Sequence, residues 1–400
     1  MRHRQFILFA LVVAFVSCTT AVDAQSAFRT AENPDKKLPW YQPVPGEFPP
    51  ANSAHYIQGE LISVNAFERK LILRVDRNDS QQRGVWDLPL PLTLLPYGSI
   101  YHHGAPAALR DIPIGTHLHA LCYVKDPADK TPPIAAFQGR ISPESEFRQC
   151  IRLEDDFSFR ARQKQIWQID EVDLKERNLT ATLHVNGKPI DQPKKFSLLA
   201  STQVLAGNGF GTLKSLQPGQ RVQFNLTWVG LYGPGRIRRI WLDEPARNLA
   251  ATHQIERHRL HIRERGLPGW VDAVDDKNRL VTITFFEGVD PKLFDELKGT
   301  NSEPLGWPTS GGAKNDLAPK GTLAVARECL MTYDPTNDRK GGNIVATRKV
   351  PTPLGSSGVQ IQVQCGMLLE GFRPTKIVRF YSATWPFITI PKEEQFFGRE

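Results

Sequence analysis

Cysteine, methionine and long apolar runs are all scarce in this sequence. The chain of 400 residues contains 5 Cys and 3 Met. So few thioethers argue against a methionine-rich copper site. The longest apolar run, residues 6–16, falls well short of the roughly 20 residues that span a bilayer. We therefore predict no transmembrane segment in the mature chain.

The common catalytic signatures are also missing. The sequence has no G-x-S-x-G, no H-E-x-x-H, no P-loop and no recognisable Cys–His nucleophile arrangement. Two acidic pairs, Asp155-Asp156 and Asp275-Asp276, fall in predicted turns, where carboxylates are normally solvated. These absences favour a non-enzymatic protein and predict no cofactor. A hydrolase with its site between modules stays an alternative.

The N-terminus has the form of an export signal. A basic start, the apolar run and small residues before a cleavage point succeed one another in residues 1–24. We predict that this segment is a signal peptide and that the mature protein is exported to the periplasm or the extracellular space. Acylation at Cys18 would make it a lipoprotein, but Phe15 stands where such sites carry a Leu-like residue.

Positive charge exceeds negative charge, and proline and glycine are plentiful. The 50 Lys and Arg against 42 Asp and Glu favour an anionic partner, such as a surface polymer or glycan. Aromatic and basic residues do not recur together on predicted strands, so no nucleic-acid partner is predicted. Residues 25–55 are Pro-rich and predict an extended lead-in, with Trp40 and Tyr41 as its candidate anchors. The oligomeric state is left open.

Three segments of the chain share one hairpin pattern. In each, a strand rich in β-branched residues, a charged turn and a second such strand follow one another. The residues that flank the turns are Val64 and Leu71, Val172 and Leu179, and Val274 and Leu280.

A second pattern follows the hairpin in two of these segments. Two apolar residues three apart precede a glycine by three more positions: Leu109, Ile112 and Gly115, and again Leu213, Leu216 and Gly219. The apolar pair would plug the end of a barrel on one helical turn, and the glycine would permit the chain to reverse. Residues 317–323 match this pattern loosely in the third segment.

Together the two patterns resemble the small OB-like β-barrel modules, of unassigned function, that occur singly or in tandem in exported bacterial proteins. The resemblance covers most of residues 56–153, 165–242 and 267–380. It implies a mostly β chain of three tandem small OB-like barrels and carries no catalytic residues. From the repeat we expect the same strand order in all three modules.

Residues 243–266 predict one long linker helix between the second and third modules, and residues 381–400 a tail without a clear element. Asp243 caps the helix and Gly266 ends it. Its predicted inner stripe includes Leu249, His253 and Leu260, whereas His258 and His261 are expected on a solvated basic face. The candidate anion-binding residues are Arg257, Arg259 and Arg263.

Four histidines of the first module are candidate ligands for Zn²⁺ or Cu²⁺: His102, His103, His117 and His119. His117 and His119 are two residues apart, so they share one face of a strand. No carboxylate or cysteine has a spacing that completes the set. The matching positions of the second module are Arg221 and Gln223, which favours an ordinary outward polar face. A metal-binding periplasmic protein is the alternative.

Four cysteines remain after signal removal, an even number in an oxidising compartment. Their spacing from the second pattern predicts two disulfides, Cys122–Cys150 and Cys329–Cys365, each joining one strand to the next. The matching positions in the second module, Leu226 and Arg239, both lack cysteine. The favoured interpretation is an exported, non-enzymatic structural or binding protein of the cell envelope or extracellular space.

Overall fold

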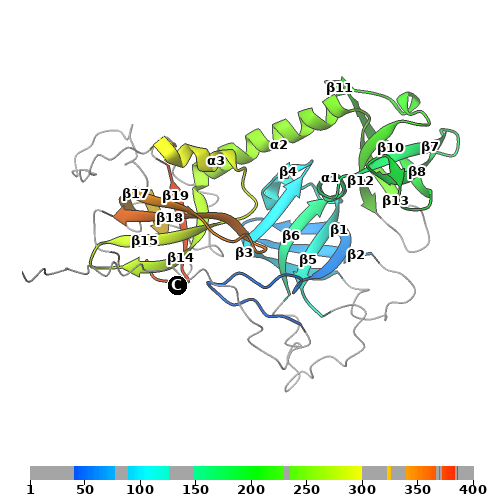
Figure 1. The fold of residues 1–400 in the computed structure, drawn as a ribbon. Helices are drawn as coiled ribbons and strands as arrows, with labels where there is room; N and C mark the ends of the chain where they lie inside the picture. The colour runs from blue at the N-terminus through cyan, green and yellow to red at the C-terminus, as the bar shows by residue number, and fades with distance from the viewer. Residues whose placement is uncertain are drawn as a thin grey trace, which may run out of the picture.

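A computed structural model describes residues 40–76, 89–125, 148–228, 235–299, 322–325, 339–365, 369, 372–382 and 385. They form three small β-barrels and one long helix (Figure 1). The predicted mostly β chain of three barrels with a linker helix is confirmed. The signal peptide, Cys18 and Cys329 lie outside the described residues. Within those residues, no helix has the length and apolar character to cross a membrane.

Barrel 1 is a closed five-stranded barrel with a short extra strand. The order β2-β1-β5-β6-β3 closes through the pairing of β2 with β3, and β3 runs parallel to β6. Its elements are β1 (His55–Asn65), β2 (Lys70–Val75), β3 (Leu90–His102), β4 (Ala105–Pro106), the 3-10 turn η1 (Leu109–Asp111), β5 (His117–Tyr123) and β6 (Gln149–Asp155). Helix α1 (Asp156–Arg162) then leads into barrel 2.

Barrel 2 repeats this strand order. The order β10-β13-β12-β7-β8 closes through the pairing of β10 with β8, and β10 runs parallel to β13. Its elements are β7 (Gln165–Asp173), β8 (Asn178–Val185), β9 (Lys188–Pro189), β10 (Lys194–Ala206), β11 (Gly209–Phe210), the 3-10 turn η4 (Leu213–Ser215), β12 (Arg221–Trp228) and β13 (Gly235–Trp241).

Barrel 3 is closed by six strands in a different order, β14-β15-β18-β17-β16-β19, all antiparallel. The expectation of one strand order in all three modules is therefore wrong for the third. Its elements are β14 (Leu267–Asp275), β15 (Leu280–Phe286), α3 (Lys292–Asp295), the 3-10 turn η5 (Glu296–Gly299), β16 (Thr322–Val325), β17 (Arg339–Lys349), β18 (Ser356–Cys365) and β19 (Ile377–Tyr381).

One anchor point is common to the three barrels. Leu61, Ile169 and Val271 each lie on the first strand of their barrel, just before a register shift. Each is buried. Its backbone N–H and C=O form hydrogen bonds with the two residues just before the strand that neighbours it on the side away from the hairpin. In barrels 1 and 2 the N–H groups of Gly115 and Gly219 donate to these residues, at 2.7 Å in both cases. The second sequence pattern therefore fixes where the chain turns into β5 and β12.

In barrel 3 the residue at the glycine position is Thr375, whose N–H donates to Val271 O at 3.0 Å. Leu369 and Phe372 precede it at the same spacing of three, and Thr375 has the positive φ of 73° that glycine adopts in the other copies. The match of residues 317–323 to this pattern was wrong, because a threonine replaces the glycine at the true site. The hairpin β16–β17 fills the place between β18 and β19 that β6 and β13 fill in the other barrels.

The three charged turns end alike, on an arginine with positive φ: Arg69 at 56°, Arg177 at 51° and Arg279 at 55°. The cross-strand partners that flank these turns are Val64 with Leu71, Val172 with Leu179 and Val274 with Val281. The number of residues between the two partners is therefore the same in all three barrels.

We expect Arg177→Gly to stabilise barrel 2 by about 0.5–1 kcal/mol, because the left-handed conformation strains every residue except glycine. Arg177 is exposed, and its carbonyl bond to Leu198 N needs no side chain. Urea unfolding measures the gain. Arg177→Ala is the control and should give no gain; equal effects of the two variants would contradict the strain.

Helix α2 (Glu244–Arg265) matches the predicted linker, with the Asp243 carboxylate accepting from Ala246 N and Gly266 at its end. Its inner face was wrongly predicted, since Leu260 is 60% exposed. The buried residues are instead Ala246, Gln254, His258, Ile262 and Arg265. These residues recur at helical spacing and form one face of α2. Most of them are polar, so the search for an apolar stripe in the sequence did not find this face.

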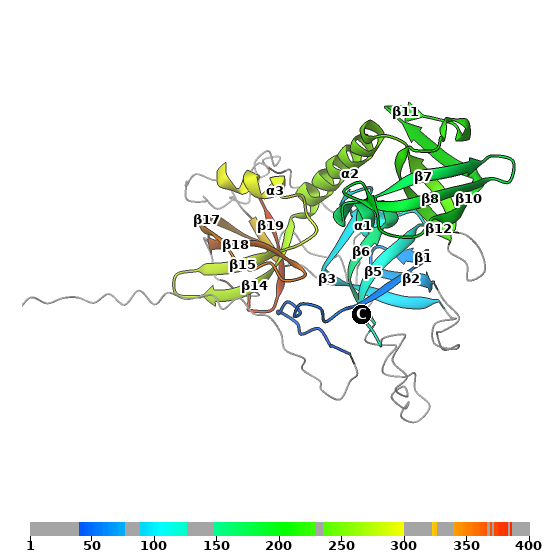
Figure 2. The same ribbon diagram turned by 45° about the vertical axis from the view of Figure 1, so that its right-hand side comes forward.

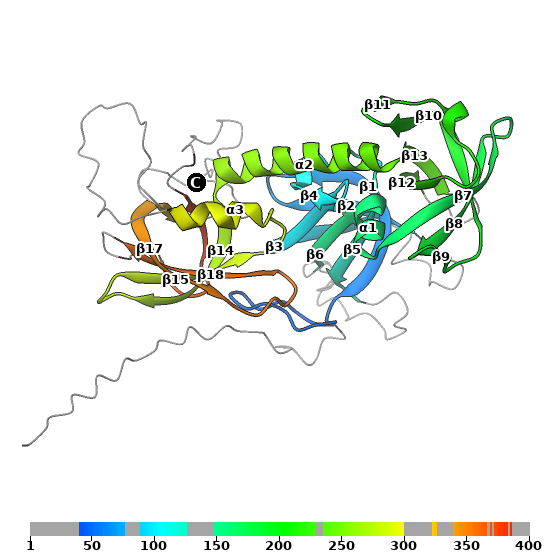
Figure 3. The same ribbon diagram turned by 45° about the horizontal axis from the view of Figure 1, so that its top comes forward.

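The barrels pack against one another around α2. Figure 1 and Figure 3 show α2 passing along barrel 1 on its way from barrel 2 to barrel 3, and Gln254 donates to Pro106 O of barrel 1 at 3.2 Å. An aromatic cluster joins barrels 1 and 3 and includes residues of the lead-in. Figure 2 shows the lead-in, in blue, passing below both barrels. Trp40 and Tyr41 are buried as predicted. The cluster contains Tyr41, Phe48, Tyr97, Tyr123, Trp270 and Phe286.

Candidate metal centre

The residues where β6 passes into α1 form the centre of a buried polar cluster. Asp155 caps α1, its carboxylate accepting from Ser158 N at 2.8 Å. Asp155 is 0% exposed and Asp156 5% exposed. The expectation that these carboxylates are solvated turn residues was therefore wrong, because barrel 2 packs directly over this turn.

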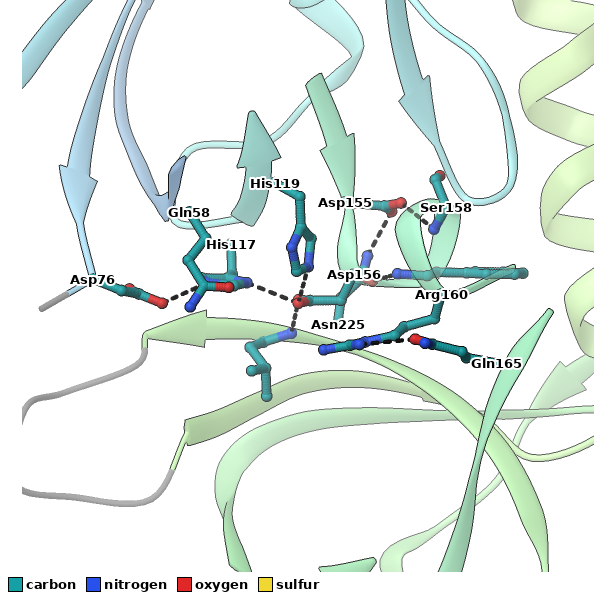
Figure 4. A network of polar contacts seen from close by, with 12 residues as sticks. Gln58, Asp76, His117, His119, Asp155, Asp156, Ser158, Arg160, Gln165 and Asn225 are labelled. Atoms are coloured by element: carbon teal, nitrogen blue, oxygen red, sulfur yellow. Dashed lines mark hydrogen bonds and ion pairs between the residues drawn. The ribbon is translucent and has the colours of Figure 1, made fainter. Parts of the chain in front are cut away.

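Two of the candidate histidines converge on Asp156. His117 Nδ1 lies 2.7 Å from Asp156 Oδ1, and His119 Nε2 lies 3.0 Å from the same oxygen (Figure 4). Both histidines are buried, at 2% and 3% exposure, so the favoured interpretation as an outward solvated face was wrong. The carboxylate that completes the set was missed because it lies 37 and 39 residues away in sequence.

A second layer orients both rings. His117 Nε2 lies 2.8 Å from Asp76 Oδ2, and His119 Nδ1 forms a short contact with the Tyr56 hydroxyl. Phe159 of α1 stacks on His119 with ring centroids 3.8 Å apart. Each imidazole is thus held from both sides, and sequence analysis singled out neither Asp76 nor Tyr56.

The charges of the cluster follow from this packing. Burial alone would raise the pKa of Asp156, but His117 and His119 hold it well below its usual range. Burial would lower the pKa of His117, yet Asp156 and Asp76 outweigh it and raise that pKa to about 10. Burial lowers the pKa of His119. A carboxylate between one charged and one neutral imidazole is therefore the resting state.

The other two candidate histidines form a separate group with Asp155. His102 Nδ1 lies 3.0 Å from Asp155 Oδ2, and the His102 and His103 rings stack at 3.7 Å. Burial, with help from His102, lowers the pKa of His103 to about 3. Asp155 also accepts from His103 N, Ser158 N and Asn225 Nδ2. Its oxygens are thus already occupied by hydrogen bonds, which makes this group the poorer metal site.

The cluster also ties barrel 1 to barrel 2. Asn225 Nδ2 donates to Asp155 at 2.7 Å, and Leu226 N donates to Asp156 Oδ2 at 2.8 Å. Thr227 and Arg238 of barrel 2 donate to the carbonyls of Gly115 and Ile114. The two barrels therefore share the environment that buries the histidines.

The His117–His119–Asp156 group has the donor chemistry of a transition-metal site. Two imidazole nitrogens and one carboxylate oxygen lie within 4.8 Å of one another, all on buried residues. Nitrogen and oxygen ligands of this kind suit Zn²⁺ and Cu²⁺. Ligating histidines usually direct their second nitrogen to a carboxylate or another polar group, as His117 does to Asp76 and His119 to Tyr56.

The candidate anion-binding arginines of α2 are largely occupied by barrel 3. Arg259 forms an ion pair with Asp290, and Arg263 forms one with Glu296, in which Arg263 Nη2 lies 2.6 Å from Glu296 Oε1. Arg257 is the most exposed of the three, 3.9 Å from Asp111. Anion binding by this row stays a prediction, with Arg257 as its most accessible member.

Cys122 and Cys150 lie opposite each other on β5 and β6, both are fully buried, and both are free thiols in this structure, so the bond between them stays a prediction. The equivalent pair in barrel 2 is Leu226 and Ile237, so the match to Arg239 was wrong by two positions. Cys365 lies on β18, where its N–H donates to Arg279 O as Leu94 N donates to Arg69 O. Cys365 therefore corresponds to Leu94 of barrel 1 and not to Cys150. The predicted Cys329–Cys365 bond assumed that Cys365 corresponds to Cys150, so the alignment used to predict it was wrong.

His258 of α2 is 3% exposed rather than solvated, and burial lowers its pKa to about 4, against the opposing effect of Asp111 and Asp290. Between pH 6.5 and 4 the unfolded chain binds a proton there that the folded protein does not. We therefore expect stability to fall as pH drops through this range, by about 3 kcal/mol from His258 alone.

Urea unfolding of the wild type and of His258→Leu at several pH values checks this. Burial also lowers the pKa values of His103, His119 and His261, so the difference between the two proteins isolates the contribution of His258. The charged and titratable neighbours that stay constant in the pair are Arg110, Asp111, His261, Arg265, Asp290 and Arg379. Parallel pH curves for the two proteins would contradict the shift.

Comparison with known proteins finds no family model that matches the sequence and no curated protein that does. A crystal structure of Ag(I)-bound CusF covers 20% of this chain and 95% of its own, at 13% identity and a TM-score of 0.15. A Cu(II)-bound CusF variant from Escherichia coli covers 20% and 90%, at 15% identity and a TM-score of 0.15. At these TM-scores the likeness carries no information about function.

Proposed function

We propose that this chain is an exported, non-enzymatic metal-binding protein built from tandem OB-like barrels, with one transition-metal site at His117, His119 and Asp156. Export rests on the signal-like pattern of residues 1–24. The metal is Zn²⁺ or Cu²⁺, since the donors are two imidazoles and a carboxylate.

The observation that carries the proposal is the convergence of both imidazoles on one carboxylate oxygen. His117 Nδ1 and His119 Nε2 lie 2.7 and 3.0 Å from Asp156 Oδ1. An ion placed among these three atoms would take the place of the shared protons, and Asp76 and Tyr56 would still hold the outer nitrogens. A binding role is favoured over catalysis because His117, His119 and Asp156 are buried and line neither the cavity beside α2 and barrel 3 nor the one next to His102 and His103.

Metal analysis of the purified mature chain tests this proposal. After removal of bound ions by a chelator, titration with Zn²⁺ or Cu²⁺ in a calorimeter should give one ion per chain. His119→Asn should abolish that binding. His184→Asn is the matched control, because His184 is also buried but belongs to barrel 2. Absence of stoichiometric metal, or loss of binding in both variants alike, would leave the cluster as a structural hydrogen-bond network.

Asp76→Asn tests the second layer of the site. We expect metal affinity to fall by about 10- to 100-fold, because the carboxylate that orients His117 and raises its basicity is lost. Asp170→Asn is the control, since Asp170 bonds Thr182 on barrel 2. Calorimetric titration of both variants measures the difference, and equal affinity of Asp76→Asn and the wild type would contradict the assignment of His117 as a ligand.

A further inference from the structure

A second site lies where barrel 1, α2 and barrel 3 meet. The described residues line a cavity of about 350 Å³ there, within the size range of small-molecule sites. Its apolar lining comes from all three parts of the chain: Leu94, Ile100, Leu109, Ile262, Phe286 and Val289. Apolar walls hold water poorly, so a cavity of this kind suits a ligand with an apolar body.

The charged side chains around this cavity already have partners. Arg69 donates to three backbone carbonyls of β3, with 2.6 Å for the shortest bond, and Arg379 donates to two carbonyls at the end of α2. Arg110 and Arg265 also have interaction partners. Glu287 forms an ion pair with an arginine of β6. The cavity therefore does not require a charged ligand.

His258 of α2 differs from these charged residues. It lines the cavity, is 3% exposed, and neither of its ring nitrogens has a hydrogen-bond partner in the part of the chain that the structure describes. Because burial lowers its pKa to about 4, the ring is neutral at pH 7 and offers one N–H donor and one acceptor nitrogen. Buried polar side chains are rarely left without a partner, so each exception requires an explanation.

A hydroxyl group is the ligand chemistry that matches a neutral imidazole. It can donate to the unprotonated ring nitrogen or accept from the protonated one. A hydrocarbon would fill the cavity but leave His258 without a hydrogen bond, which is costly for a buried polar group. A carboxylate would lose its hydration while the lining arginines keep the partners they already have, which disfavours an anion.

We propose that this cavity binds a neutral, largely apolar small molecule that carries a hydroxyl group, with the hydroxyl on His258 and the apolar body against the aliphatic and aromatic walls. This site uses none of the residues of the metal site, so either proposal can fail without the other. Phenols and aliphatic alcohols share this chemistry, and the first experiment separates the two.

The first experiment titrates the full mature chain with p-cresol, cyclohexanol, toluene and benzoate in a calorimeter. At least one of the two hydroxyl compounds should bind one per chain, and about 10-fold or more tightly than toluene or benzoate, as expected from one buried hydrogen bond. Tighter binding of p-cresol indicates a phenol, and tighter binding of cyclohexanol an aliphatic alcohol. Equal or tighter binding of toluene or benzoate, or failure of both hydroxyl compounds to bind at about 10 mM, would overturn the proposal.

The second experiment tests the hydrogen bond to His258. His258→Leu should bind the preferred hydroxyl compound about 10-fold or more weakly. Removing a buried polar group without a partner should also raise the melting temperature of the ligand-free variant by about 2–5 °C, which shows that the fold is intact. His253→Leu is the matched control, because His253 is an exposed histidine of α2 that does not line this cavity. Equal affinities of the two variants would contradict the assignment of His258.

The third experiment fills the cavity without changing His258. Ala108 lines the cavity and is half-buried, so Ala108→Leu should occupy part of its volume and weaken binding of the same compound by about 10-fold or more. Ala250→Leu is the matched control, because Ala250 is also half-buried but lines the other cavity, next to His102 and His103. Its affinity should equal that of the wild type. Binding that both variants retain, or that both lose alike, would place the compound elsewhere and overturn the proposal.

Discussion

Asp156→Asn should destabilise barrel 1 by about 3–5 kcal/mol, the range for breaking a buried ion pair by removing one partner. Asp156 Oδ1 accepts from both His117 and His119, while Oδ2 accepts from Leu226 N. An asparagine amide places its NH₂ against one of these donors whichever way it turns. The buried charge on His117 would also lose its nearer carboxylate.

Amide hydrogen exchange of β5 and β6, with a chelator present, measures this local free energy of opening. The conservative substitution Asp276→Asn is the control, since Asp276 is exposed and pairs with the exposed Arg373. We expect the control to stay within about 0.5 kcal/mol of the wild type. If Asp156→Asn also did so, the cluster would not hold the two barrels together.

The Cys122–Cys150 disulfide should form in protein recovered from an oxidising compartment and stabilise barrel 1 by about 3–4 kcal/mol. The two residues pair across β5 and β6 and are fully buried. Burial and the neighbouring Cys150 raise the pKa of the Cys122 thiol, so the reduced pair would be unreactive once folded. A bond here closes a loop of about 30 residues, for which the chain-entropy model gives this magnitude.

Non-reducing peptide mapping detects this bond, and unfolding with and without reductant gives its contribution. The double variant Cys122→Ala with Cys150→Ala should lose all sensitivity to reductant. Free thiols at both positions in the exported protein, or a peptide linking Cys122 to Cys329, would contradict the prediction. The Cys329–Cys365 bond stays a sequence-based prediction, since Cys329 lies outside the described residues.

The amino-acid sequence by itself determined the local elements of this protein. Hairpin turns after Val64, Val172 and Val274, the glycine reversals at Gly115 and Gly219, and the Asp243 and Gly266 ends of α2 all depend on neighbouring residues. Such elements are readable because turn chemistry and capping act within a few residues of the chain.

Only the tertiary structure decided the closure of barrel 3 and the composition of both candidate sites. The β16–β17 hairpin occupies a place that the other barrels give to their last strand, and Thr375 replaces the expected glycine. Asp156 meets His117 because barrel 2 covers the turn after β6. His258 is buried because α2 packs between two barrels. Contacts between residues far apart in sequence leave no periodic pattern. The side chains of the candidate sites were therefore predicted to be solvated, although the folded protein buries them.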